Sequence, residues 1–133
     1  MTSRKVFQLL LVVLGTVALV AGGLGVVFGA AVIPGSPDAA PSVDSELRFF
    51  AAWYVAAAVA IFRAARNPEE SRDAIRLVGA AFFLAASGRL ISLVVVGRPH
   101  VQFIILMVIE FLLPIVLIPW QAAVARGQTE GGD

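Results

Sequence analysis

Four long apolar stretches determine what this chain can fold into. They lie at about residues 6–33, 45–62, 75–96 and 101–124, and each reaches the roughly 17–25 residues with which an α-helix crosses a bilayer. The 133 residues are 59% hydrophobic and 14% charged. A soluble domain is typically about half apolar and about a quarter charged, so a small soluble core would leave much of this surface in water. The composition therefore favours a single domain dissolved in lipid.

Turn signals divide the second half of the chain into two helices. Asn67, Pro68 and Glu70 have the spacing of an N-cap, a first-turn proline and a glutamate whose side chain accepts from the N-cap backbone N–H. We therefore expect the third helix to begin there. Gly97 followed by Pro99 is typical of a helix end. The connection GRPH is short, which makes the third and fourth helices antiparallel neighbours. The pattern predicts an all-α integral membrane four-helix bundle with up-down-up-down topology.

The two ends of the chain need separate interpretation. Arg4 and Lys5 precede the first apolar stretch, as in a secretory signal peptide. The apolar part of a signal peptide has only about 7–15 residues, so the greater length of this stretch favours an uncleaved membrane span. Residues 126–133 are polar and rich in glycine, and we expect a mobile tail there.

Small residues are spaced for close helix packing. Gly25 and Gly29 form a GxxxG pattern in the first stretch. Alanine recurs at every fourth position of the second stretch, at Ala52, Ala56, Ala60 and Ala64. Such patterns let helices approach closely in membranes. We favour packing within the chain over a homodimer contact, because the pattern is common in membrane helices.

Basic residues are distributed unevenly between the two sides of the predicted bundle. One side holds Arg4, Lys5, Arg63, Arg66, Arg72, Arg76 and Arg126. The other side holds Arg48 and Arg98. The positive-inside rule places the first group in the cytoplasm, so both termini are expected inside and the loops 34–44 and 97–100 outside. The expected location is the cytoplasmic (inner) membrane, as a multi-pass protein.

Two charged residues lie deep inside apolar sequence. In an antiparallel hairpin, Arg89 lies about 12 Å and Glu110 about 15 Å below the outer turn, from the helical rise per residue. A single charge at mid-bilayer costs about 2.5–3.5 kcal/mol or more. Because arginine can form two hydrogen bonds with a carboxylate, we predict that Arg89 and Glu110 pair with each other.

Further polar residues define a candidate site near the outer leaflet. Glu46 and Arg48 lie at the start of the second helix, and Ser92 lies one turn beyond Arg89. With Glu110 these residues form the predicted ligand-binding or structural polar cluster. A structural staple between helices is favoured over a ligand or ion site, and contact with a partner protein is a further alternative. Arg48 near an interface is more often a membrane anchor than a ligand group.

The order of several short motifs resembles a known family. The motifs are Glu46, Arg48 and Phe49; Gly88, Arg89 and Ser92; Gly97 and Pro99; and Glu110 with Pro114. In this order the chain is similar to bacterial domain-of-unknown-function family 4345, a group of small four-span membrane proteins. The resemblance covers nearly the whole chain. It implies a four-helix membrane bundle and no established activity.

Residues with catalytic or metal-binding chemistry are sparse. The chain has no cysteine, one histidine (His100) and a net charge of only +1, which gives no support for thiol chemistry or nucleic-acid binding. We expect no cofactor and no metal, and we lean towards a protein that is not an enzyme. The preferred prediction is an accessory or helper subunit in the lipid bilayer, with a membrane-protein partner or as a homo-oligomer. The alternative is a binder or transporter of a small polar or anionic ligand through Arg48, Arg89 and Glu110, as an oligomer.

Overall fold

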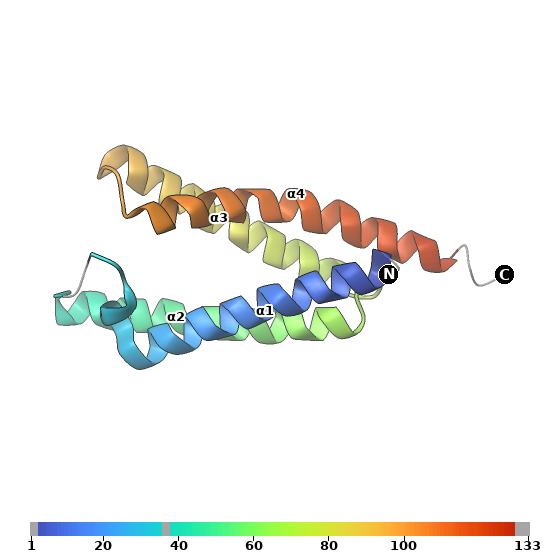
Figure 1. The fold of residues 1–133 in the computed structure, drawn as a ribbon, viewed down its shortest axis with the longest axis horizontal. Helices are drawn as coiled ribbons and strands as arrows, with labels where there is room; N and C mark the ends of the chain where they lie inside the picture. The colour runs from blue at the N-terminus through green and yellow to red at the C-terminus, as the bar shows by residue number, and fades with distance from the viewer. Residues whose placement is uncertain (1–2, 36–37, 130–133) are drawn as a thin grey trace. The chain divides into compact units, whose positions relative to one another are not determined.

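Every regular element among the described residues is helical. The computed structural model describes residues 3–35 and 38–129. Its elements are α1 (Ser3–Phe28), the short 3₁₀ helix η1 (Gly29–Val32), α2 (Pro41–Arg66), α3 (Arg72–Val95) and α4 (Val101–Thr129), in the order shown in Figure 1. All four α-helices are long and apolar enough to cross a membrane. The expected all-α class and the number of spans are confirmed.

Most helices extend beyond their apolar stretches. α2 begins at Pro41 and continues to Arg66; proline suits a first helical turn, where its missing N–H leaves no bond unmade. α4 continues to Thr129, so residues 126–129 of the expected tail are helical, and residues 130–133 lie outside the described part. A polar sequence can extend a helix into water, so apolar length underestimates helix length.

The start of α3 corrects the predicted N-cap. α3 begins at Arg72 with Ser71 in the capping position, and Asn67 does not cap it. Ser71 Oγ instead donates to the carbonyl of Asn67 at 2.7 Å. The buried Gln121 amide of α4 donates to the carbonyls of Pro68 and Glu69, at 3.1 and 3.3 Å. Residues 68–70 form a turn, and the carbonyls of Pro68 and Glu69 in it bind α4.

The chain divides into two compact units, and each is described by itself. The α1–α2 unit contains Gln8–Arg66, and the α3–α4 unit contains Asn67–Asp133 together with the first turn of α1 up to Phe7. Each unit is built around one pair of long helices.

Glycine sets the close approach of α1 and α2. A Cβ atom on Gly22 would lie 2.8 Å from the carbonyl oxygen of Ala51, and one on Gly25 would lie 2.7 Å from the Cβ of Ala51. Gly15 meets the ring of Phe62 in the same way, so the helices run antiparallel. The expected packing of Gly25 within the chain is confirmed.

The alanine stripe of α2 differs from its expected role. Within the stripe Ala52 and Ala56 are exposed, Ala60 is half-buried and Ala64 is buried, and the other buried alanines of α2 are Ala51, Ala58 and Ala65. A helix has 3.6 residues per turn, so a spacing of four rotates gradually away from the face that packs. The expected packing inside the chain is therefore met at Ala64 and, in part, at Ala60, and is not met at Ala52 and Ala56.

α3 and α4 pack along a regular seam. Buried and half-buried residues recur at alternating spacings of four and three: Ile75, Gly79, Phe82, Ala86, Arg89 and Leu93 on α3, and Phe103, Met107, Glu110, Pro114, Leu117 and Gln121 on α4. This spacing is typical of knobs-into-holes packing between helices. Aromatic rings of Phe83 and Phe111 meet edge to face at 5.4 Å beside the seam. The seam spacing therefore decides which side chains of α3 face which side chains of α4.

The first turn of α1 is tied to the end of α4. The rings of Phe7 and Trp120 lie 5.4 Å apart, and the Trp120 indole donates to Ser3 Oγ at 2.9 Å. Arg4 donates to the carboxylate of Glu69. Burial alone would raise the pKa of Glu69, but the hydrogen bonds from Arg4 and from its own backbone N–H, with the charge of Arg4, hold that pKa below its ordinary range.

Exchanging neighbouring glycines of α1 for alanine tests this packing. We expect Gly22→Ala to lower the free energy of unfolding in detergent by about 1–3 kcal/mol, as overpacking does. The added methyl would press on α2 backbone atoms at 2.8–2.9 Å. Gly23 has no atom within 4 Å of an added Cβ, so Gly23→Ala should be neutral or stabilising by up to about 1 kcal/mol. Equal stability of the two variants would contradict the described contact.

Candidate functional site

An ion pair between Arg89 and Glu110 lies in the α3–α4 seam. Arg89 Nε donates to Glu110 Oε2 at 2.8 Å, and Arg89 Nη2 donates to Glu110 Oε1 at 3.3 Å. The side chain of Glu110 is only 5% exposed and that of Arg89 is 27% exposed. The predicted pair is therefore present, with the two-pronged geometry that a guanidinium offers to a carboxylate.

The turn between α3 and α4 sets the register of this pair. α3 ends at Val95, and the N–H groups of Val96 and Gly97 both donate to the carbonyl of Ser92, at 2.9 and 3.3 Å. Gly97 has a φ of 119°, a left-handed region that glycine occupies without a steric penalty. The predicted helix end at Gly97 is confirmed. Because the turn is tight, residues of α3 and α4 that lie at similar distances from the turn face each other. Arg89 of α3 is placed opposite Glu110 of α4 in this way.

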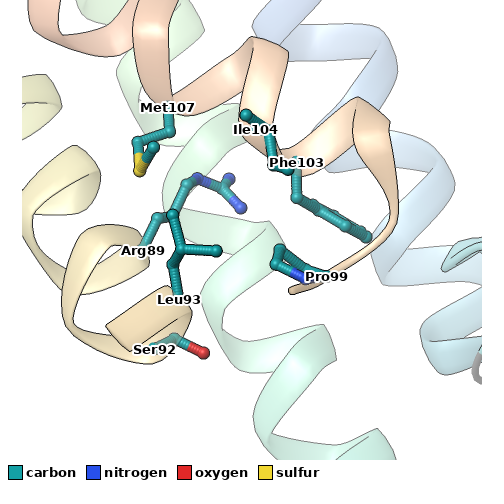
Figure 2. Close-up of a pocket in the computed structure, with 7 residues that line it drawn as sticks. All are labelled: Arg89, Ser92, Leu93, Pro99, Phe103, Ile104 and Met107. Carbon is teal, nitrogen blue, oxygen red and sulfur yellow. The ribbon is translucent and has the colours of Figure 1, made fainter. Parts of the chain in front are cut away.

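A small pocket lies beside the Arg89 side chain (Figure 2). It has a volume of about 130 Å³ and is lined by Arg89, Ser92, Leu93, Pro99, Phe103, Ile104 and Met107. The Arg89 guanidinium carbon lies 5.6 Å from the centre of the Phe103 ring, within the range of a cation–π contact. The pocket therefore combines one charged group, one hydroxyl and mainly apolar walls.

Arg48 takes part in a second polar group, in the α1–α2 unit. Its Nε donates to Asp44 Oδ2 at 2.7 Å, and its Nη1 donates to the carbonyls of Val26 and Val27, at 2.7 and 2.8 Å. Asp44 Oδ1 accepts from the N–H of Ala30 at 2.8 Å. Arg48 thus satisfies carbonyls at the end of α1 that have no helical partner.

Gly29 makes room for this group. Its φ is 57°, and a Cβ atom there would lie 1.9 Å from Asp44 Oδ1. The position accepts glycine because both the backbone conformation and the neighbouring carboxylate exclude a side chain. In the sequence, Gly29 was assigned to helix packing; its nearest contacts are with the polar group of Asp44 and Arg48.

The remaining predicted site residues have simpler surroundings. Glu46 is exposed at the start of α2, and Ser92 is exposed and lines the pocket. Phe103, Met107 and Pro99 line the pocket together with Arg89, and their place beside it is not among the sequence predictions. The spacing of Phe103, Met107 and Glu110, four and then three residues apart, was a signal that could have placed them on one face.

The chemistry of the site is that of a neutralised ion pair. Among the described residues no group of three or more His, Cys, Asp or Glu side chains lies close enough to hold a metal ion. In the same part of the chain, every buried side-chain nitrogen and oxygen has a hydrogen-bond partner. Removing one partner of such a buried ion pair strongly destabilises the folded protein, because the remaining charge is left buried without a counter-charge.

A charge-reversal cycle tests the pair. We expect Arg89→Glu and Glu110→Arg each to lower the free energy of unfolding in detergent by about 3–5 kcal/mol, because each leaves two like charges facing each other with one of them almost fully buried. The double variant should recover most of the loss. Thermal and denaturant unfolding of the purified protein would measure all three.

Arg98→Glu is the matched control for the charge-reversal cycle. Arg98 is exposed in the turn that follows α3, so reversing its charge should change stability by no more than about 0.5 kcal/mol. Single variants as stable as this control, with no recovery in the double variant, would show that the pair does not hold the hairpin.

Comparison with known proteins gives one match. Residues 6–121 match the family model described as Domain of unknown function (DUF4345). Searches of curated proteins and of solved structures gave no match. The match covers most of the chain, so the protein belongs to the DUF4345 family.

Proposed function

We propose that this DUF4345 protein is a non-enzymatic accessory subunit of the cytoplasmic membrane. Its four apolar helices support a small multi-pass membrane protein. In the proposed role, the chain contributes a stable helical surface to a membrane complex. Its partner is another membrane protein, and a homo-oligomer is the simplest alternative assembly.

The observation that carries this proposal is the engagement of the charged side chains within the apolar segments. Arg89 binds Glu110 in the α3–α4 unit, and Arg48 binds Asp44 and the end of α1 in the α1–α2 unit. Here the charged groups hold helices and turns together, which supports a structural role.

The apolar surface of the helices supports the same role. Large aliphatic side chains are exposed on all four helices, for example Val17, Val59, Leu84 and Ile115. In a bilayer such surfaces contact lipid or another helix, and the close packing of small residues drives association between helices. Ala52 and Ala56 of α2 offer a smooth exposed surface of this kind.

A second candidate function is supported by the pocket beside Arg89. The sequence suggested a binder or transporter of a small polar or anionic ligand through Arg48, Arg89 and Glu110. The contacts of Arg48 are with Asp44, Val26 and Val27 inside the α1–α2 unit. Of Arg48, Arg89 and Glu110, only Arg89 lines the pocket. A ligand-binding function would therefore use the α3–α4 unit.

The proposed orientation places both termini in the cytoplasm. The chain has no cysteine, so single cysteines can report the side of the membrane. We expect Arg98→Cys to react with an impermeant maleimide in intact spheroplasts, and Arg66→Cys to react only after the membrane is opened. Both positions are exposed. Labelling in the opposite order would contradict the orientation that follows from the positive-inside rule.

Isolation of the native complex tests the accessory role. After mild solubilisation from membranes at native expression, we expect the chain to elute with one stoichiometric membrane-protein partner. The double charge reversal of Arg89 and Glu110 should keep this partner, because the proposed role of the pair is structural. A purely monomeric protein, or a partner lost in the double variant although the fold is restored, would contradict the proposal.

A further inference from the structure

The pocket in the α3–α4 unit has the size of a small organic group. Its volume is about 130 Å³. A water molecule in the liquid occupies about 30 Å³, and an apolar cavity of about 150 Å³ in another protein binds benzene. The space therefore suits a single ring or a short section of an apolar chain. Five of its seven lining residues, Leu93, Pro99, Phe103, Ile104 and Met107, present apolar surfaces.

The charge balance of the pocket disfavours an anion. Arg89 is the one charged lining residue, and Glu110 neutralises it through two hydrogen bonds. An anionic ligand that took over the guanidinium would leave the Glu110 carboxylate, which is 5% exposed, without its counter-charge. An uncharged ligand avoids that cost. A bound cation would lie against the Arg89 guanidinium, so positive ligands are disfavoured as well.

Two polar features favour a ligand that carries an accepting oxygen. Ser92 places a hydroxyl on the wall, and a hydroxyl can donate one hydrogen bond. Figure 2 shows the Arg89 side chain extending from α3 toward Phe103 and Pro99, with Leu93 beside it. The positive charge favours the negative end of a carbonyl dipole even while Arg89 remains bound to Glu110.

We propose that the pocket between α3 and α4 binds an uncharged, lipid-soluble molecule through a carbonyl oxygen. The oxygen lies toward Ser92 and Arg89, and the apolar body lies among Leu93, Phe103 and Met107. Such a carbonyl belongs to membrane-soluble ketones and quinones or to the ester of a lipid. This site is independent of the accessory role, since either can hold without the other.

Three matched fluorinated probes test the chemistry of the site. Para-fluoroacetophenone is an uncharged ketone, para-fluorotoluene lacks the oxygen, and para-fluorobenzoate is an anion of similar shape. Binding to the full chain in detergent is followed by fluorine NMR. We expect saturable binding of the ketone about fivefold tighter than that of the toluene, as one hydrogen bond provides. The benzoate should bind more weakly than the ketone.

Two identical substitutions on α4 locate the site. Ile104 lines the pocket and Ile109 does not; Ile109 is exposed on the same helix. Ile104→Phe should fill the space and abolish saturable ketone binding, whereas Ile109→Phe should leave it unchanged. Partition of the probe into detergent is the same for both variants, so the difference reports the pocket. Their unfolding temperatures are measured alongside.

Ser92→Ala provides a test that does not depend on filling the pocket. Its side chain is exposed, so the fold should be retained, and the ketone should lose its preference over the toluene. A fluorinated methyl ester of a medium-chain fatty acid distinguishes the source of the carbonyl. Tighter binding of the ketone points to a ring-bearing ligand, and tighter binding of the ester points to a lipid.

Three results would overturn the proposal. They are tightest binding of the benzoate, equal binding of the ketone to wild type and Ile104→Phe when both are folded, and an unchanged ketone preference in Ser92→Ala. Tightest binding of the benzoate would mean that the site prefers an anion. Equal binding to wild type and Ile104→Phe would mean that the probe partitions into detergent. An unchanged ketone preference in Ser92→Ala would mean that Ser92 does not donate to the ligand.

Discussion

The ion pair of Arg89 with Glu110 is the contact on which the α3–α4 unit depends. A seam between two membrane helices normally contains small or apolar residues, because lipid gives charged groups no hydration. Here two seam positions carry opposite charges, and their hydrogen bonds are 2.8 and 3.3 Å long. A shift of either helix by one turn would separate the charges. The pair is therefore compatible with the one register that the turn at Gly97 sets, and buried polar groups are well suited to favour a single register.

The same principle applies at the turn of the α1–α2 unit, with different residues. Arg48 donates to the carbonyls of Val26 and Val27, Asp44 accepts from the N–H of Ala30, and Gly29 leaves space for the carboxylate. In both units, charged side chains complete bonds that the bilayer cannot provide. Small residues then allow the helices to approach, as Gly22 and Gly25 do against Ala51. Charged side chains that form specific hydrogen bonds and small residues that allow close approach together explain how a chain with so few charged residues holds its helices in register.

The two polar groups differ in their surroundings. The α1–α2 group is engaged at the end of a helix, whereas the Arg89 group borders a pocket of about 130 Å³. A neutralised arginine beside an apolar pocket suits an uncharged carbonyl-bearing ligand better than an anion. Membership of the DUF4345 family agrees with this size and helical content and assigns no activity.

The sequence by itself determined the helical class, the four apolar spans and the pairing of Arg89 with Glu110. Those features follow from local properties, namely apolar length, turn residues and the cost of a single charge in lipid. Only the tertiary structure decided the start of α3, where Gln121 captures the carbonyls of Pro68 and Glu69, and the partners of Arg48. It also decided which alanines of α2 are buried. These features depend on contacts between residues far apart in the chain, and local sequence spacing carries no record of which distant group supplies the hydrogen bond.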